Sequence, residues 1–163
     1  AKEYPEAGDI VKTVMNYQVF FNRDEIKSKQ LDFDNIKQTV VNVLKEDPSV
    51  LYACDMAKAS TESIPEEVKS RIINGYNRER SGDVVIILKP NFYAHGMKGT
   101  DHGAWNSYDT HIPLVFMGWG IKHGATTKQT FMTDIAPTIA AMLHVQAPNG
   151  CVGKAIFGNN ICQ

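Results

Sequence analysis

The chain has 163 residues, of which 43% are hydrophobic, and its 17 basic and 18 acidic side chains leave almost no net charge. This length and apolar content suffice for one hydrophobic core, so we expect a single domain over residues 1–163. The charge balance and the lack of a long basic cluster argue against a nucleic-acid partner. The best apolar run, residues 112–121, is about half as long as a membrane span requires.

The first half of the chain alternates strand-like and helix-like patterns. Aromatic and branched residues predict buried strands at 17–22, 50–56 and 84–90. A helical period after the first strand predicts a helix that Asp34 caps and that Asp47 and Pro48 end. A second helix is expected from Pro65, a residue suited to the first turn, to Gly75, because glycine commonly ends helices. This alternation favours a layered α/β domain.

The second half repeats the pattern once. Residues 113–120 read as another buried strand, and residues 132–145 as a helix capped by Thr133 or Asp134, with Pro137 in its first turn. Residues 91–112 follow neither period. Long connections without regular structure are usually functional in compact domains, so this loop is the place to look for a site.

The stretch "GTDHGAWNSYDTHIP", residues 99–113, holds the best candidates for metal binding. Zinc takes nitrogen, oxygen or sulfur donors that converge on it, often from loops. His102 is the best single candidate, because Gly103 after it allows an unusual backbone turn. Asp109 and His111 are expected either to bind the metal or to orient a ligand. From the residues alone, a solvated or hydrogen-bonded histidine is the preferred interpretation of this loop.

Three cysteines are present, and their uses differ. Cys151 and Cys162 are eleven positions apart in a glycine-rich tail, and they can close a small disulfide loop in an oxidising compartment or remain free thiols. Cys54 lies in an apolar run, which favours a small core residue over a reactive one.

Four runs carry a resemblance to a known family: "RSGDVVIILKP", "KGTDHGAWNSYDTHIPLVFMGWGIKHG", "TDIAPTIAAML" and "PNGCVGKAI". In order and spacing they resemble the carboxy-terminal part of the alkaline phosphatase superfamily. In particular, they are similar to the bacterial, periplasmic, phosphate-irrepressible alkaline phosphatases and to the nucleotide pyrophosphatase/phosphodiesterase relatives. The resemblance covers about residues 17–157, and its specific element is H-G, five residues, D-T-H-I-P.

The resemblance implies a two-zinc hydrolase that acts on phosphate monoesters or diesters and is periplasmic or secreted. His102 matches the histidine that binds the zinc on the leaving-group side, whereas no ligand role carries over to Asp101. The family's nucleophile and its other ligands have no counterpart before residue 99. We therefore expect a carboxy-terminal fragment that lacks the amino-terminal part of the same protein. Alone, it should be inactive and hold no zinc tightly.

The same resemblance implies a layered α/β sandwich with a mixed, mostly parallel sheet. Residues 84–145 would form part of its core, with the metal-ligand loop at 91–112, and residues 17–80 an inserted strand-helix-strand-helix subregion. A sheet separated from its neighbours exposes an edge, so the fragment is also expected to self-associate. Two alternatives remain open. One is a non-catalytic binding module of this fold, and the other is a complete small metal-dependent hydrolase built from Asp101, His102, Asp109 and His111.

Overall fold

The structure is a computed structural model that describes residues 10–93, 102, 105–118 and 120–157. The chain divides into two compact units, residues 1–112 and residues 113–163, and each is described by itself. Among the described residues, the search for a helix both long and apolar enough to cross a bilayer finds none.

The first unit contains a sheet and most of the helices. Its strands are β1 (Val11–Met15), β2 (Gln18–Phe21), β3 (Val50–Asp55) and β4 (Val84–Leu88). Its helices are α1 (Arg23–Ser28), α2 (Phe33–Glu46), the 3-10 helix η1 (Met56–Thr61), α3 (Glu66–Gly75) and the single turn α4 (Ser107–Thr110). The strands predicted at 17–22, 50–56 and 84–90 and the two predicted helices are confirmed within a few residues.

The strand order is β1-β2-β4-β3, and every neighbouring pair is antiparallel. The layered α/β class is confirmed, but the expected mostly parallel pairing is wrong for the described strands. β2 and β3 do run parallel to each other, since both are antiparallel to β4. The segment that contains α2 connects β2 to β3, which are not neighbours in the sheet. β4 lies between these two strands and runs antiparallel to both, as in a split β-α-β unit.

β1 and β2 form a hairpin that the sequence did not reveal. Met15 pairs with Gln18, and the two residues between them, Asn16 and Tyr17, have φ values of 51° and 58°. Positive φ at both central residues is the mark of a type I′ turn, whose twist matches that of two-residue hairpins. β1 is mostly exposed, so it lacks the buried apolar pattern by which strands are recognised.

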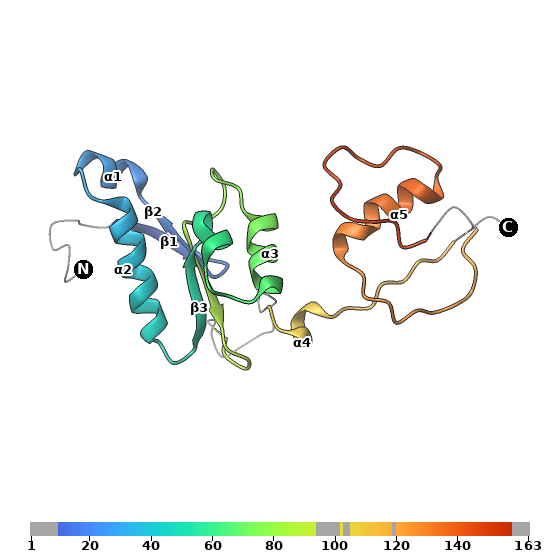
Figure 1. Cartoon of the computed structure of the whole chain (residues 1–163), viewed down its shortest axis with the longest axis horizontal. Helices are drawn as coiled ribbons and strands as arrows, with labels where there is room; N and C mark the ends of the chain where they lie inside the picture. Colours follow the sequence, from blue (N-terminus) through green and yellow to red (C-terminus); the bar gives the residue numbers. More distant parts are fainter. Residues whose placement is uncertain (1–9, 94–101, 103–104, 119, 158–163) are drawn as a thin grey trace. The chain divides into compact units, whose positions relative to one another are not determined.

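Helices cover the two faces of this sheet, α2 on one and α3 on the other (Figure 1). β4 shows the alternation that this requires, because Val84 packs in the cluster with α2 and Ile87 packs in the cluster with α3. Val84 is fully buried. Two separate apolar clusters thus hold the first unit together, one on each face.

α2 begins two residues earlier than the capping prediction implied. Asp32, rather than Asp34, is the N-cap, and its carboxylate accepts a hydrogen bond of 3.1 Å from the backbone amide of Asn35. Asp34 instead lies in the first turn and pairs with Lys37. The predicted end of the helix is correct, since Asp47 is the C-cap.

The second unit contains the 3-10 helix η2 (Met132–Asp134) and α5 (Ile135–Met142), and little other regular structure is described. Residues 113–118, predicted to begin a strand, are extended but pair with no described strand. A β-strand is recognised by its hydrogen bonds to a neighbouring strand, and no described strand lies beside these residues. The predicted helix is confirmed but ends early, at Met142.

Asp134 is the N-cap residue of α5, but its side chain makes no capping hydrogen bond to this helix. The carboxylate accepts hydrogen bonds from the backbone amides of Lys154, at 2.8 Å, and Phe131, at 2.9 Å. These two bonds stabilise the charged form and lower the pKa of Asp134. The residue therefore ties the start of α5 to the chain twenty positions later.

Replacing glycine with alanine should have opposite effects on stability at two positions of the first unit, Gly82 and Gly75. A Cβ at Gly82 would lie 2.7 Å from Cβ of Gln18 and 2.9 Å from the carbonyl oxygen of Val19, whereas Gly75 has nothing within 4 Å. Gly82→Ala should lower the free energy of unfolding by about 1–3 kcal/mol. Gly75→Ala, at the end of α3, should raise it by about 0.5–1 kcal/mol. Urea denaturation of both variants checks this, and equal effects would contradict the close approach at Gly82.

Candidate metal centre

The candidate site is a histidine held by a carboxylate. Nδ1 of His102 lies 2.5 Å from Oδ1 of Asp109. The imidazole is 89% exposed, whereas the carboxylate is only 12% exposed. The structure thus brings together two of the three loop residues singled out from the sequence, with the carboxylate partly withdrawn from water and the imidazole presented to it.

The single turn α4 positions Asp109. The backbone amide of Asp109 donates to the carbonyl oxygen of Asn106 at 2.9 Å, and that of His111 donates to Ser107 at 2.9 Å. The hydroxyl of Tyr108 accepts hydrogen bonds from the backbone amide of Asn91 and from the side chain of Asn106. The turn is therefore attached to the chain that leaves β4.

A second attachment ties the residues before α4 to α3. Nη1 of Arg71 donates to the carbonyl oxygen of Trp105 at 3.1 Å, and Nη2 of Arg71 bonds Glu67 at 2.7 Å. Trp105 also packs against the apolar cluster of α3. The loop that carries the candidate site is thereby fixed to the sheet on one side and to α3 on the other.

The contact between His102 and Asp109 has a direct chemical consequence. A carboxylate at Nδ1 fixes the orientation of the ring and favours a proton on that nitrogen, which leaves Nε2 as the nitrogen that can bind a metal. Carboxylates support metal-binding histidines in this way, and they also raise the basicity of the ligand. The described contact thus has the form that this support takes, with the carboxylate at Nδ1 of the ring.

Of the other predicted site residues, His111 is the one that the structure describes. His111 follows α4 directly and is exposed, and no hydrogen bond or ion pair between described residues links its side chain to either partner. Asp101 and Gly103 lie outside the described residues. So does Cys162, and its pairing with Cys151 stays a prediction.

A zinc site requires more donors than His102 and Asp109 supply. Structural and catalytic zinc sites use three or four protein ligands. Within the described part of the chain, no group of three histidine, cysteine, aspartate or glutamate side chains could hold a metal ion. His102, with Asp109 beside it, could supply one ligand of such a site, and the described residues supply no others.

Cys54 is no substitute donor. It is buried in the cluster beneath α3, and burial raises the pKa of its thiol to about 11. A thiolate is the form that binds metals and attacks substrates, so this cysteine is inert at neutral pH. The prediction of a core role is confirmed.

An apolar cavity of about 230 Å³ lies beside α3, on the face of the sheet away from α2. Met56, Val85 and Ile87 line it from the sheet side, and Trp105 and Phe92 line it from the loop side. The indole Nε1 of Trp105 is buried and has no hydrogen-bond partner among the described residues. No sequence pattern indicated this cavity, because its walls come from elements far apart in the chain.

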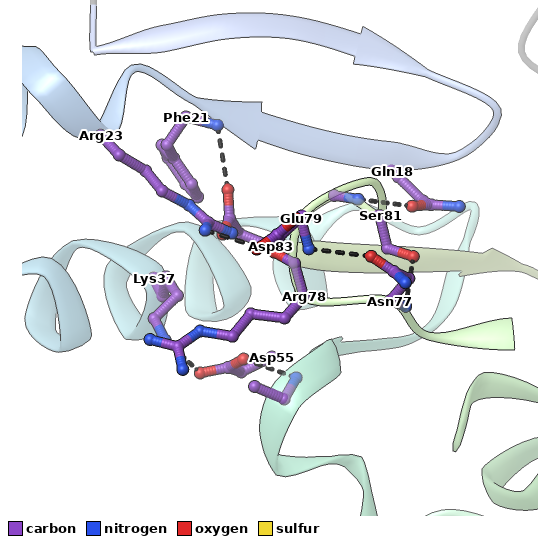
Figure 2. A network of polar contacts seen from close by, with 12 residues as sticks. Gln18, Phe21, Arg23, Lys37, Asp55, Asn77, Arg78, Glu79, Ser81 and Asp83 are labelled. Carbon is purple, nitrogen blue, oxygen red and sulfur yellow. Dashed lines mark hydrogen bonds and ion pairs between the residues drawn. The ribbon is translucent and has the colours of Figure 1, made fainter. Parts of the chain in front are cut away.

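A second polar cluster, also missed from the sequence, lies where β2 and β3 end and β4 begins (Figure 2). Asp83 directly precedes β4. Its carboxylate accepts hydrogen bonds from Nη2 of Arg23 at 2.5 Å and from the backbone amide of Phe21 at 3.1 Å. A charged residue directly beside a predicted buried strand was the available signal, but nothing indicated its partner sixty residues away.

Asp55, at the end of β3, forms the neighbouring part of this cluster (Figure 2). Nζ of Lys37 lies 2.6 Å from Oδ2 of Asp55 and 2.9 Å from Oδ1 of Asp34, and the amide of Ala57 bonds the other oxygen of Asp55. Burial alone would lower the pKa of Lys37, but the hydrogen bonds to Asp55 and Asp34 outweigh it and raise this pKa. The same contact with Lys37 lowers the pKa of Asp34.

This cluster is structural. All four oxygens of Asp55 and Asp83 already accept hydrogen bonds, and each carboxylate has a cation beside it. Buried charges of this kind are tolerated when both are paired and hydrogen-bonded. The arrangement ties α2, through Lys37, and the start of α1, through Arg23, to the end of the sheet.

Removing the buried cation should therefore be costly. Lys37→Met leaves the carboxylate of Asp55 buried and unpaired, and we expect the free energy of unfolding to fall by about 3 kcal/mol. Lys29→Met is the matched control, because Lys29 pairs with Glu25 at a more exposed site, where about 0.5 kcal/mol is expected. Urea denaturation at neutral pH measures both.

The pH dependence of this difference has a definite sign. The pKa of Lys37 is higher in the folded chain than its ordinary value of 10.5. The stabilisation is thus complete below that value and is lost as the pH rises through the higher folded pKa. Equal losses in the Lys37→Met and Lys29→Met variants at neutral pH would contradict the role of the buried pair.

The contact between His102 and Asp109 predicts a defined tautomer. In the neutral ring, the proton should reside on Nδ1, because that nitrogen faces the carboxylate. Two-bond proton–nitrogen NMR spectra distinguish the two tautomers. Asp109→Asn should weaken the preference, whereas His111, without such a partner, is the internal reference. An Nε2–H tautomer at His102 in the unsubstituted chain would contradict the assignment.

Comparisons with known proteins agree with this piece of an α/β fold. The chain is 50% identical over 151 residues to the alkaline phosphatase PafA of Elizabethkingia meningoseptica, covering 92% of the chain and 28% of that protein. It is 49% identical over 144 residues to the alkaline phosphatase PhoV of Synechococcus elongatus, covering 88% and 26%. A protein of Myroides odoratus named calcium-transporting ATPase is 47% identical over 150 residues, covering 91% and 27%.

The fold gives the same result. The crystal structure of wild-type PafA matches 95% of this chain and 30% of its own, with a TM-score of 0.89 and 47% identity. A PafA variant with four substitutions matches with a TM-score of 0.88 and 48% identity. No family model matches the chain.

These matches confirm the resemblance to the alkaline phosphatases. The chain is an alkaline-phosphatase-like piece, homologous over most of its length to somewhat more than a quarter of each relative. It spans less than a third of the length of the relatives that it matches.

Proposed function

We propose that this chain contributes one zinc-binding histidine, His102, to a two-zinc enzyme that hydrolyses phosphate esters. The observation that carries the proposal is the bond between Nδ1 of His102 and the carboxylate of Asp109. Its support is the homology to alkaline phosphatases at 49–50% identity. An exposed imidazole oriented by a largely buried carboxylate has a ready chemical use in such an enzyme.

The roles of the two residues differ. Nε2 of His102 would bind the zinc on the side of the leaving group, and Asp109 would act as a positioning residue that keeps the ring in one orientation. Zinc, when bound, supplies positive charge that stabilises the phosphoryl group and the departing oxygen. The remaining donors and the nucleophile would come from polypeptide outside this chain.

The proposal extends to substrate and location only at the level of the family. Phosphate monoesters and diesters both fit it, because the residues that would distinguish them lie elsewhere. A periplasmic or secreted location follows from the same resemblance. The chain alone should hold zinc weakly, since water would have to supply most of the ligands, and it should be inactive.

Zinc titration followed by NMR tests the proposal. We expect His102→Ala to abolish the perturbation of the loop by zinc, because it removes the ligand. Asp109→Asn should weaken zinc binding about 10–100-fold, since the ring loses the carboxylate that orients it. His111→Ala is the matched control and should bind zinc as the unsubstituted chain does.

Two outcomes would contradict the proposal. Zinc that perturbs the His102→Ala and unsubstituted chains equally would mean that the ion binds elsewhere. Turnover of 4-nitrophenyl phosphate by the isolated chain with zinc, lost in His102→Ala, would instead mean a complete small hydrolase.

A further inference from the structure

We infer that Arg71, on α3, is a positioning residue for the histidine of the candidate metal centre. Its guanidinium bonds the carbonyl of Trp105, directly before the N-cap of α4, and α4 carries the carboxylate that contacts His102. The metal role of His102 rests on the proposed function. The series of contacts from α3 to the imidazole does not depend on it.

Arg71 uses two nitrogens for partners on two different segments. Nη2 pairs with the carboxylate of Glu67, one turn earlier on α3, at 2.7 Å, and Nη1 donates to the carbonyl oxygen of Trp105 at 3.1 Å. The planar guanidinium fixes the directions of its donors relative to one another, so the bond to Glu67 aims the other nitrogen at the loop. Arg71 thus connects α3 to a residue 34 positions later in the chain.

The carbonyl of Trp105 is also linked to the end of α4. The hydroxyl of Thr110, the last residue of α4, lies 3.5 Å from this oxygen and donates to the next carbonyl, that of Asn106, at 3.1 Å. The same carbonyl of Asn106 accepts the backbone amides of Asp109 at 2.9 Å and of Thr110 at 3.0 Å. The peptide between Trp105 and Asn106 therefore sets the position of Asp109.

Arg71 supplies an orientation that the packing of Trp105 does not. The indole of Trp105 packs against the apolar cluster of α3, and apolar packing is non-directional. A hydrogen bond is directional, because it weakens steeply when donor and acceptor are misaligned. The bond from Arg71 thus orients the peptide plane at the start of α4, and with it the carboxylate four residues later.

This role is one of position more than of stability. The side chains of Arg71 and Glu67 are 39% and 60% exposed, and exposed ion pairs add little to the free energy of unfolding. Water can replace the hydrogen bond to an exposed carbonyl, but a water molecule is not attached to α3. The loss of Arg71 should therefore be measurable at His102 while the chain stays folded.

Substitution of Arg71 tests this role by NMR of the full chain. In Arg71→Met, zinc should bind about 3–10-fold more weakly than in the unsubstituted chain, since Asp109 is held less firmly against the imidazole. The preference of the neutral His102 ring for a proton on Nδ1 should fall as well. Arg71→Lys should resemble Arg71→Met, because an ammonium lacks the two directed nitrogens.

Two controls separate position from stability. Glu67→Gln removes the ion pair on α3 but leaves the bond from Nη1 to Trp105, so zinc affinity and the tautomer should stay unchanged. Val41→Ala creates a cavity in the apolar cluster on the other face of the sheet and lowers the free energy of unfolding. It should leave both measurements at His102 unchanged.

Two results would overturn the role of Arg71: unchanged zinc affinity and tautomer in Arg71→Met, or equal changes in Arg71→Met and Val41→Ala. Full zinc affinity in Arg71→Lys would mean that charge alone acts, which contradicts the hydrogen-bonded link. The proposed function fails separately. If zinc binding does not depend on His102, the tautomer still decides, because a shift in Arg71→Met supports the link and no shift overturns it.

Discussion

The position of β4 is the constraint on which the first unit depends. It lies between β2 and β3, and both of its faces are covered, since Val84 packs toward α2 and Ile87 toward α3. Burial on both faces forces the charges at its first end to be neutralised within the protein, which Arg23 does for Asp83. The chain that leaves its other end, at Leu88, leads to the loop that carries His102. β4 thus packs against two helices, begins beside an ion-pair cluster and ends at the loop of the candidate site.

Sequence patterns predicted what depends on near neighbours. The helix α2 and the buried strands β2, β3 and β4 each carry a period that a short window reveals, and Asp47 before Pro48 ends α2 as expected. The direction of β4 was not predicted, because strands and helices alternate along the chain in the same way whether β4 is parallel or antiparallel to β2 and β3. Residues 113–118 have the composition of a strand, yet composition cannot supply the neighbouring strand that makes one.

In the candidate site, too, the sequence predicted what depends on near neighbours and missed what depends on packing. A histidine followed by glycine in a long irregular loop drew attention to His102, and the short spacing to Asp109 made their contact plausible. The structure adds that Nδ1 is the nitrogen in contact, which no spacing predicts. The pair of Lys37 and Asp55 and the cavity beside Trp105 could not be found this way, because their parts meet only after the sheet and helices have packed.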